Sequence, residues 1–466
     1  MISMGWPVHE IAIALRTVLV ETSNLELIKT KTVRLIQTDS RQVGSDDLFV
    51  CLQGDRFDAH QFVPEVIEQG CLGVVTDRLL PLNVAQWVVR DTRKALGLLA
   101  LNWRSRFNMP VVGVVGSNGK TTCKEMLASV AGVGWSEHEI CSTQGNLNNE
   151  IGVPLTLFRL RSHHRFAVIE MGMNHPGEIS VLAEMVKPNS VLLTNAQREH
   201  QEFMKSVALV AQENGTAFTW LNAEGVAVFP ADTPFDKLWC DQAKGRKIIR
   251  FGTSGQVALV ARSEGAALRF GQKFFPCSPK FMGAHHYSNA SGVAAVCRAM
   301  GFSEQQIVQG LERFTPVQGR FKLVCDTDHL KLIDDTYNAN PDSVNAASEY
   351  LSTLPGSTVL VLGDMGEVGD QAENFHREVG DKAKKLGINK VFLLGEHTRF
   401  TVEGFGVGAQ HYENIESLLL DLNETLRQQK YTVLVKGSRF MKMERVVQAL
   451  TASTSNTPNQ GEHYVS

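Results

Sequence analysis

The sequence lacks the features that mark several classes of protein. Its 466 residues show no internal repeat with a period of about 20 to 50 residues, which excludes solenoids and propellers. No apolar run approaches the roughly 18 residues that span a bilayer. The first residues, MISMGWPVHEIAIALRTVLV, lack the cationic start of a secretory signal. We therefore expect a soluble cytoplasmic protein, monomeric and without membrane insertion.

An excess of positive charge is missing as well. Lys plus Arg number 46 against 49 Asp plus Glu, so the net charge is −3. This balance argues against nucleic-acid binding through a basic surface, but it leaves room for a local basic pocket that faces a small anion. The 8 cysteines are scattered, with no CxxC pair and no metal-like cluster. We expect them to be reduced and mostly buried.

The length predicts about three domains, and the pattern of apolar runs and turns differs between three parts of the chain. Residues 1–108 mix short apolar runs with Gly and Asp turns, which indicates a small α/β unit. Continuous apolar runs then appear at 111–115, 166–171 and 190–195, with helical spacing between them. Such runs are typical of parallel strands buried on both faces, so 109–317 is predicted to hold a doubly wound sheet. Residues 226–282 indicate a β-rich insertion or edge.

A third α/β pattern covers 318–452, with strand-like runs at 331–335, 358–364, 390–395 and 432–438. The spacing of Ser303 and Gln306 predicts a capping box before this unit, and Thr315-Pro316 is a candidate linker. Residues 453–466 are polar and turn-forming, and we expect them to be a disordered tail.

The segment after the strand at 111–115 predicts a phosphate site. It reads Gly116-Ser117-Asn118-Gly119-Lys120-Thr121-Thr122 and leads into a helical period. A Gly-rich bend at a helix N-terminus gathers backbone N–H groups around an anion, while a lysine can reach the terminal phosphates and a hydroxyl can bind Mg²⁺. The usual first glycine of the loop is replaced by Val114, so the loop is a variant. The competing interpretation is a Gly-rich turn with a surface lysine.

A carboxylate follows another buried run. Glu170 lies at the end of the strand-like run 166–171, where the carboxyl edge of a parallel sheet would place it near the phosphates and a hard cation. Taken alone, it could equally be a surface acid at a strand end.

Further motifs occur in a fixed order along nearly the whole chain: GSNGKTT at 116–122, QGNLNNEIGVPL at 144–155, EMGM at 170–173, Thr194-Asn195 with His200, Asn289, Gly319-Arg320 and DDTYNANP at 334–341. Together they resemble the Mur ligases of peptidoglycan synthesis. The segments TDSR at 38–41, LFVCLQGDRFDAHQF at 48–62, GDMGEVG at 363–369 with His376, and LVKGSRFMKME at 434–444 look most like those members that join D-alanyl-D-alanine to UDP-N-acetylmuramoyl-tripeptide.

This resemblance implies an α/β fold of three domains: one for the UDP-sugar peptide, a central parallel-sheet ATPase of the P-loop type, and a Rossmann-like C-terminal domain that closes over both substrates. It also implies ATP and Mg²⁺ as cofactors and an acyl-phosphate intermediate. Positive charge is then needed where two anions meet, and water must be kept from the acyl phosphate.

The resemblance assigns roles to individual residues. The implied catalytic residues are Lys120, Glu170, His200 and Arg320, and the implied metal ligands are Thr121, Glu170 and His200. For ATP they are Gly116, Ser117, Asn118, Gly119, Lys120, Thr121, Thr122, Asn289, Arg320, Asp335 and Tyr337. For the UDP substrate they are Ser40, Arg41, Phe57, Asp58, His60, Asn146, Asn148 and Asn149, the three asparagines being expected to shape the pocket beside the phosphates.

Simpler interpretations stand beside these roles. The asparagines could cap a loop, Asn289 could be a helix N-cap, Arg320 could be a solvated linker residue, Asp335 and Tyr337 could form a plain turn, and Arg41 could lie free in solvent.

Two positions depart from the family pattern. Members commonly carry, fourteen residues after the histidine, a lysine whose carbamate helps to hold a second Mg²⁺, whereas this chain has Asn214. Glu213 or Glu202 could supply the missing charge. His286 follows His285 where many members have asparagine, which weakens an assignment of His285 to the nucleotide.

Three other functions compete with the implied one. Folylpolyglutamate synthetase shares the ATPase core and the acyl-phosphate chemistry, but it would not explain the TDSR and GDRFDAHQF segments. The Mur ligase that adds the third amino acid should carry a DNPR-like motif, and we find GDMGEVG in that unit instead. A nucleotide-gated binding protein without turnover would be consistent with Asn214.

Overall fold

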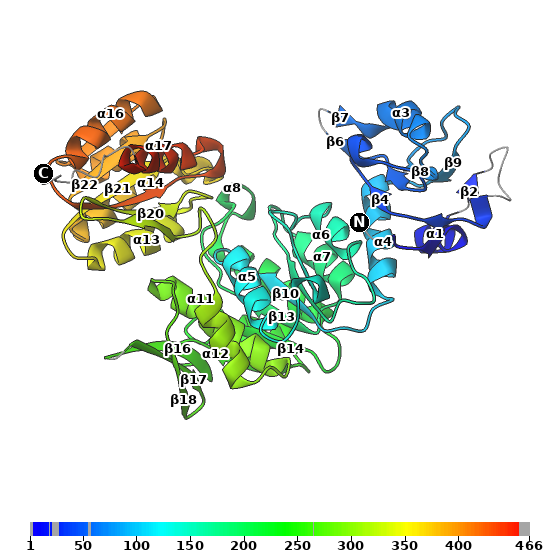
Figure 1. Cartoon of the computed structure of the whole chain (residues 1–466), viewed down its shortest axis with the longest axis horizontal. Coiled ribbons are helices and arrows are strands. Elements are labelled where there is room, and N and C mark those ends of the chain that lie inside the picture. The colour runs from blue at the N-terminus through cyan, green and yellow to red at the C-terminus, as the bar shows by residue number, and fades with distance from the viewer. Residues whose placement is uncertain (1–2, 18, 21–27, 55–56, 264, 456–466) are drawn as a thin grey trace, which may run out of the picture.

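The computed structural model describes residues 3–17, 19–20, 28–54, 57–263 and 265–455. Asp55 and Arg56 of the motif at 48–62, and most of the expected tail, lie outside the described residues. Three α/β units follow one another along the chain, and each is built on its own main sheet (Figure 1). The α/β fold class predicted from the buried apolar runs is confirmed by these sheets.

The N-terminal unit is built on a five-stranded sheet in the order β2-β9-β8-β5-β4. Strands β4 to β9 of this sheet run parallel, and β2 is antiparallel to β9. The strands of the unit are β1 (Trp6–Pro7), β2 (Leu19–Val20), β3 (Thr32–Val33), β4 (Ile36–Gln37), β5 (Leu48–Val50), β6 (Gln53–Gly54), β7 (Phe57–Asp58), β8 (Gly73–Thr76) and β9 (Ala85–Val88). The helices are α1 (Val8–Leu15), η1 (Ser40–Gln42), η2 (Ala59–Phe62) and α3 (Val63–Glu68).

Helix α4 (Thr92–Arg104) joins this unit to the next one. Asp91 caps it by accepting hydrogen bonds from the backbone N–H groups of Arg93 and Lys94. Its buried leucines and Trp103 belong to one continuous apolar cluster that includes α1 on one side and α6 (Gly152–Leu157) and α7 (Glu178–Val186) on the other. The first two units therefore share a core.

The central unit holds a nine-stranded sheet in the order β11-β12-β10-β13-β14-β15-β16-β17-β18. The pairs from β11 to β16 are parallel, and β16 to β18 form an antiparallel edge. The strands are β10 (Val111–Val115), β11 (Ile140–Ser142), β12 (Phe166–Glu170), β13 (Ser190–Leu193), β14 (Val226–Pro230), β15 (Lys247–Phe251), β16 (Val257–Arg262), β17 (Gly265–Phe270) and β18 (Lys273–Cys277). The predicted β-rich character of 226–282 is confirmed, with one helix, α10 (Asp236–Gln242), inside it.

Helices cover both faces of this sheet. Alternate residues of β10 point to opposite faces, so Val112 and Val114 pack beneath α5 (Lys120–Ala131), α11 (Ala284–Ala299) and α12 (Glu304–Arg313). Val111 and Val115 face the cluster that contains α6, α7 and α9 (Val207–Gly215). The short elements are α8 (Gln201–Met204), η3 (Glu137–Glu139) and η4 (Thr216–Trp220). The capping box of Ser303 and Gln306 is confirmed at the start of α12.

The C-terminal unit holds a six-stranded sheet in the order β19-β20-β24-β21-β22-β23, parallel except for β19. The strands are β19 (Lys322–Asp326), β20 (Leu330–Asp335), β21 (Ser357–Gly363), β22 (Lys390–Leu394), β23 (Ala409–Tyr412) and β24 (Tyr431–Lys436). One face packs on α13 (Pro341–Thr353), α14 (Ala372–Lys385) and α15 (Arg399–Phe405), and the other on α16 (Ile415–Leu426) and α17 (Glu444–Ser455). Turns η5 (Gly369–Gln371) and η6 (Arg439–Met441) complete it. Helix α17 extends into the segment expected to be a tail.

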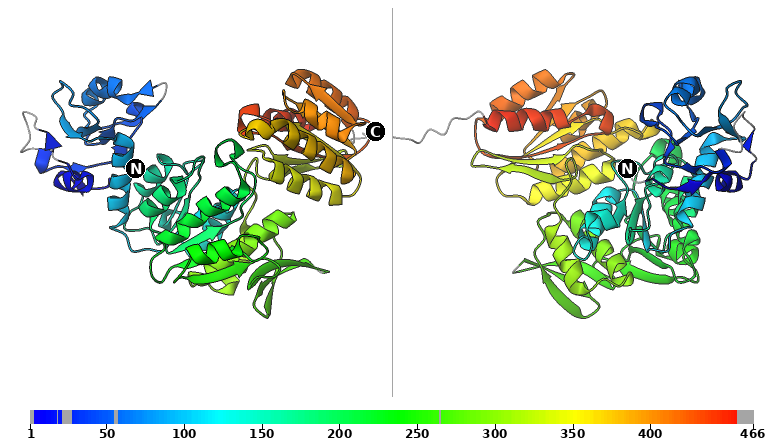
Figure 2. Two further views of the ribbon diagram at one scale, coloured as in Figure 1. Left: turned by 180° about the vertical axis from the view of Figure 1, so that it is seen from behind. Right: turned by 45° about the vertical axis from the view of Figure 1, so that its right-hand side comes forward.

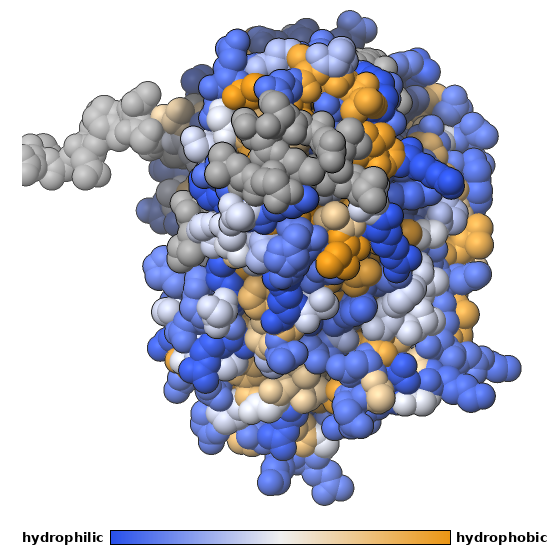
Figure 3. Space-filling view, turned by 90° about the vertical axis from the view of Figure 1, so that its right-hand side faces the viewer, coloured by the Kyte–Doolittle hydropathy of each residue, from blue (hydrophilic) through white to orange (hydrophobic). Residues whose placement is uncertain are grey.

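The first and third units stand apart, on either side of the central unit (Figures 1 and 2). The end of the molecule formed by the first unit is mainly hydrophilic, with apolar side chains interspersed (Figure 3). Within the described residues, no helix is both long and apolar enough to cross a bilayer. All eight cysteines are free, and five of them are buried, as expected.

Candidate active site

A cavity of about 1000 Å³ lies where the central and C-terminal units meet. Its walls combine the predicted phosphate loop, the segment 194–200 after β13, the start of α11 and the first turns of the C-terminal unit. Most of the residues implied for catalysis and for ATP line it, namely Ser117, Asn118, Gly119, Lys120, Thr121, Thr122, Glu170, His200, Asn289, Arg320, Asp335 and Tyr337.

The phosphate loop has the backbone that its two glycines permit. Gly116 and Gly119 have φ angles of 125° and 85°, in the region that side chains disfavour. A Cβ on Gly119 would also lie 2.6 Å from the amide of Asn289, so glycine is required there on two counts. Helix α5 begins at Lys120, and its first turn borders the cavity. The free N–H groups and positive end of that helix suit an anion.

Lys120 is turned toward its own loop. Its Nζ donates to the carbonyl oxygens of Gly116 and Ser117, and lies 3.4 Å from Oε2 of Glu199. The side chain is only 15% exposed, so these acceptors compensate a largely buried charge.

Glu170 stands at the end of β12, beside the phosphate strand β10. It is 2% exposed, its Oε1 accepts a hydrogen bond of 2.8 Å from Nδ2 of Asn148, and its Oε2 has no donor among the described residues. A buried carboxylate with an unpartnered oxygen in a cavity is unlike a surface acid at a strand end.

The three implied asparagines all line the cavity, in different ways. Asn148 holds Glu170, as described above. Oδ1 of Asn149 accepts hydrogen bonds from the backbone N–H groups of Ile151 and Gly152, which matches the simpler capping interpretation. Asn146 is exposed. These residues lie with the phosphate loop, not with the other candidates for the UDP substrate.

The C-terminal unit contributes Arg320, which is not a solvated linker residue. Its Nη2 donates to Oγ1 of Thr121 at 3.1 Å, and its guanidinium lies 3.7 Å from the centre of the Tyr337 ring. Burial lowers the pKa of Arg320, while Glu170 and Asp335 act in the opposite direction. Arg320 therefore brings a desolvated positive charge to the start of α5.

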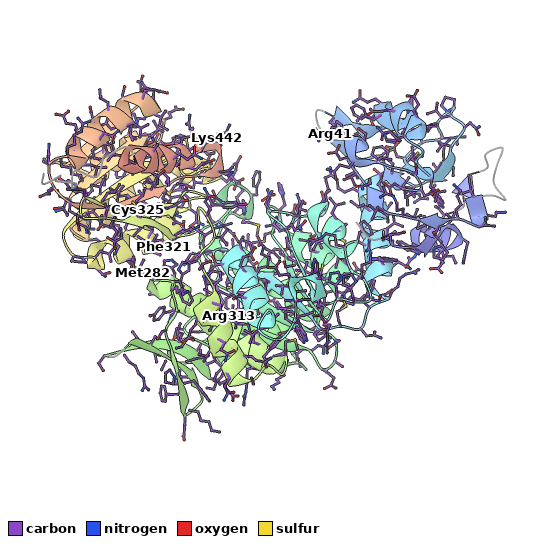
Figure 4. The ribbon with its side chains drawn as sticks, viewed as in Figure 1. Arg41, Met282, Arg313, Phe321, Cys325 and Lys442 are labelled. Carbon is purple, nitrogen blue, oxygen red and sulfur yellow. The ribbon has the colours of Figure 1, made fainter. Side chains whose placement is uncertain are left out.

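Asp335 ends β20 and is held by two groups. Its Oδ2 accepts a hydrogen bond of 2.5 Å from Nζ of the buried Lys436, and its Oδ1 accepts one of 3.1 Å from the backbone N–H of Phe321. Phe321 packs against the ring of His285 at 4.7 Å, where the C-terminal unit meets the start of α11 (Figure 4).

Asn289 lies inside α11, five residues after it begins at Ala284, so the N-cap interpretation is wrong. Its side chain is buried against Gly119. His285 borders the cavity, and His286 is buried with its Nδ1 2.9 Å from the carbonyl oxygen of Met282. Burial lowers the pKa of His285 to about 4 and that of His286 to about 3, so both are neutral at pH 7.

The segment 194–200 braces the phosphate loop. Oδ1 of Asn195 accepts a hydrogen bond from the N–H of Asn118, and Ser117 exchanges hydrogen bonds with the backbone of Gln197. His200 has a positive φ of 47°, and its Nδ1 lies 2.7 Å from Oε2 of Glu367 in the C-terminal unit.

Asn214 does not lie where the family pattern would place a ligand of a second Mg²⁺. It is 1% exposed on α9, its Oδ1 accepts a hydrogen bond of 2.8 Å from the N–H of Gly116, and its Nδ2 donates to the Val210 carbonyl oxygen. It anchors the start of the phosphate loop from behind. Glu213 accepts a hydrogen bond from the N–H of Ile179 at the start of α7, and neither it nor Glu202 borders the cavity.

The remaining UDP candidates lie in the N-terminal unit, away from the cavity walls. Ser40 is buried, and Arg41 has a side chain that is 83% exposed and pairs with Asp39, whose pKa this pairing lowers to about 2 (Figure 4). Phe57 is exposed and stacks on Phe62.

Asp58 and His60 form a charged network in the same unit. The buried His60 lies between the carboxylates of Asp58 and Asp77, at 2.5 and 3.2 Å. Arg78 pairs with Asp58 and holds the pKa of that carboxyl well below its usual range. The roles of Ser40, Arg41, Phe57, Asp58 and His60 toward a UDP group stay predictions.

The cavity residues that were not given a role from the sequence include Glu199, Asn340 and Lys436. Nδ2 of Asn340 donates to Oδ1 of Asn118 across the two units at 3.0 Å. Glu199 directly precedes His200, and Lys436 ends β24 inside the motif at 434–444, so their places beside and within the quoted motifs were the available signal.

The residues at the cavity fit a divalent cation that arrives with phosphates. No group of three or more His, Cys, Asp or Glu that could hold a metal alone is found in the described part of the chain. Mg²⁺ usually binds one or two carboxylates plus substrate phosphates and water, so such a group is not required. The unpartnered Glu170 oxygen and the Thr121 hydroxyl at the start of α5 suit this mode.

Comparisons with known proteins agree with this architecture. Residues 114–297 match the Mur ligase middle domain, and residues 319–439 match the Mur ligase, glutamate ligase domain. The chain is similar to the UDP-N-acetylmuramoyl-tripeptide--D-alanyl-D-alanine ligase of Escherichia coli, with 36% identity over 90% of this chain and 94% of that protein.

Two solved structures extend the likeness over the whole fold. A crystal structure of MurF from Acinetobacter baumannii has a TM-score of 0.90 and 32% identity, and the match covers 97% of this chain and 100% of that one. The MurF ligase of Thermotoga maritima in complex with ADP has a TM-score of 0.83 and 25% identity, and the match covers 91% of this chain and 98% of that one.

Proposed function

The chain belongs to the Mur ligase family, and from that membership we propose that it joins D-alanyl-D-alanine to UDP-N-acetylmuramoyl-tripeptide at the expense of ATP. The observation that carries the proposal is a cavity in which the phosphate loop meets Glu170 and Arg320. Its product is UDP-N-acetylmuramoyl-pentapeptide, a precursor of peptidoglycan, and the proposed location is the cytoplasm. We also propose that the chain acts as a monomer.

The reaction is divided into two transfers. The terminal carboxylate of the tripeptide attacks the γ-phosphorus of ATP, and the bond to the β-phosphate oxygen breaks to release ADP. The amine of D-alanyl-D-alanine then attacks the acyl phosphate, loses a proton, and expels inorganic phosphate as the amide forms. Phosphorylation is needed because a carboxylate is a poor electrophile and oxide is a poor leaving group.

The side chains of this cavity suit the first transfer. Two anions must approach each other, so cations have to offset their repulsion. Lys120 and Arg320 meet this need from the two units, since one follows the phosphate loop and the other contacts Thr121. Both are largely buried, where a charge acts more strongly than in water.

A cation bound with ATP would neutralise the developing phosphate charge and orient the γ-phosphoryl group. Glu170 and Thr121 are the residues that would hold it, and His200 would hold a second one. Asn148 keeps the Glu170 carboxylate in place by its hydrogen bond of 2.8 Å.

Besides contributing Arg320, the C-terminal unit would keep water out of the site. The acyl phosphate would hydrolyse in an open site. Contacts of Arg320 with Thr121 and of Asn340 with Asn118 bring the two units together at the phosphate loop itself. The UDP-sugar end of the substrate would bind the N-terminal unit, near Ser40 and Arg41, so that the peptide reaches the cavity.

An assay of phosphate release tests the proposal. We expect release that requires ATP, UDP-N-acetylmuramoyl-tripeptide and D-alanyl-D-alanine together, with the pentapeptide product seen by mass spectrometry. Release with a folate and glutamate would point to a folylpolyglutamate synthetase, and release with the UDP-dipeptide and a third amino acid would point to the neighbouring Mur ligase. ATP binding without turnover in every mixture would leave a nucleotide-gated binding protein.

A further inference from the structure

Glu199 is a buried carboxylate that the motifs leave without a role. It lies in the segment between β13 and α8 and is 6% exposed. Its Oε2 is 3.4 Å from Nζ of Lys120, and its Oε1 has no hydrogen-bond donor in the described ranges of the chain. Both Glu199 and Glu170 border the cavity, so the site contains two buried carboxylates with an unpartnered oxygen each.

Lys120 and Glu199 compensate each other in the structure. An ammonium group has three protons to donate, and the Lys120 ammonium contacts three acceptors of the chain, the carbonyl oxygens of Gly116 and Ser117 and the carboxylate of Glu199. For Lys120 to reach a nucleotide phosphate, it must give up part of this set. Glu199 would then be a buried negative charge next to a polyphosphate, which is unfavourable without a new partner.

A divalent cation is the partner that removes this cost. Carboxylate oxygens are preferred ligands of Mg²⁺, and the cation arrives with the nucleotide that draws Lys120 away. Glu202 and Glu213, the other carboxylates considered near His200, do not border the cavity, whereas Glu199 does.

We propose that Glu199 changes partner when nucleotide binds: it pairs with Lys120 in the nucleotide-free site, and it faces the divalent cation once Lys120 has moved to the phosphates. Glu199 thereby makes nucleotide binding depend on the cation. This inference rests on the proposed nucleotide site and adds a ligand that the sequence motifs do not assign.

The test is calorimetric titration of ADP into the full chain, once with EDTA and once with MgCl₂. Glu199→Gln keeps the shape of the side chain and an oxygen for Lys120 but removes the negative charge. Without divalent cation, we expect Glu199→Gln to bind ADP about tenfold more tightly than the unmodified chain, because a like-charge repulsion is gone. With MgCl₂ we expect that gain to vanish or reverse. The ratio of the dissociation constant in EDTA to that in MgCl₂ should therefore be about tenfold or more smaller in Glu199→Gln than in the unmodified chain.

The matched control is Glu202→Gln, which removes the same charge from α8, outside the cavity. Its ratio should stay within about threefold of that of the unmodified chain, because exposed charges are screened. An equal loss of ADP affinity in Glu199→Gln with and without MgCl₂ would assign Glu199 a structural role and overturn the inference. An unchanged ratio would overturn it too.

Two further outcomes are separable. If the unmodified chain bound no ADP under either condition, the nucleotide site itself would be refuted, whatever Glu199 does. If Glu199→Gln proved unfolded in a thermal melt, Glu199→Asp would serve, since it keeps the charge but retracts the carboxylate. The Mg²⁺ effect on ADP affinity should then be smaller than in the unmodified chain, and an undiminished effect would count against the proposal.

Discussion

Arg198 joins the central unit to the C-terminal unit, and its removal should loosen their contact. Nε and Nη2 donate to Oδ1 of Asp342 at 3.0 and 2.7 Å, and the two Nη atoms donate to the Glu378 carboxylate at 2.7 and 2.9 Å. These pairs raise the pKa of Arg198, against the effect of its burial, and lower that of Glu378. The Arg198→Ala change deletes all four side-chain hydrogen bonds and leaves the backbone in place.

The magnitude follows from the exposure of each pair. The side chains of Arg198 and Asp342 are 20% and 24% exposed, so this pair should contribute about 2 kcal/mol. Glu378 is 45% exposed, and solvent screening reduces its share to below about 1 kcal/mol. The docking equilibrium of the two units should therefore weaken by about 2 to 3 kcal/mol, or about 30- to 150-fold.

Two measurements check this prediction. Small-angle scattering should give a larger radius of gyration for Arg198→Ala, because the C-terminal unit separates from the phosphate loop. ADP affinity should fall by up to the same factor, since Asp335 and Tyr337 lie on the departing unit. Arg377→Ala is the matched control, because Arg377 pairs with Glu403 inside the C-terminal unit. An unchanged radius with ADP affinity within threefold of the unmodified chain would refute the reasoning.

Three further predictions concern the phosphate loop and the two histidines at the start of α11. Lys120→Ala should abolish phosphate release and leave UDP-tripeptide affinity nearly intact by calorimetry; loss of that affinity would contradict binding in separate units. Asn214→Lys should lower the unfolding free energy by about 2 to 4 kcal/mol, because the buried N–H of Gly116 loses its acceptor, and an unchanged urea midpoint would exclude this anchoring role. The pKa values of about 4 and 3 for His285 and His286 lie below the ordinary 6.5, so the unfolded chain binds more protons and stability should fall as pH drops from about 6.5 to 4. His286→Asn should make that decline shallower in urea titrations, and an equal slope would rule out the histidine as its cause.

The sequence predicts the elements that depend on local pattern. The run Val111–Val115 is apolar at every side chain because it is buried on both faces, and the glycines that follow are needed for their positive φ angles. The sequence also predicts where polar residues at strand ends lie, because parallel strands bring their carboxyl ends to one edge of the sheet. For this reason Glu170 was expected at the sheet edge beside the phosphate loop, whereas Asp335 was assigned to ATP only through the family resemblance.

Contacts between distant segments cannot be predicted in this way. Asn118 and Asn340 are 222 positions apart, and nothing in either segment specifies the other. The use of Asn214 as an anchor depends on how α9 packs behind the loop, which the spacing from His200 does not reveal. Asn149 satisfies a local capping pattern that outweighs its place in a longer motif.

The contact formed by Arg198 also restricts how the chain can be recombined with its relatives. A hybrid that takes its C-terminal unit from another ligase would keep every strand and helix, yet it would inherit whatever residues stand in place of Asp342 and Glu378. Where the donor lacks these two acids, the hybrid would fold but assemble poorly. Exchange of modules in this family should therefore succeed only when residue 198 and its two acidic partners are transferred as a set.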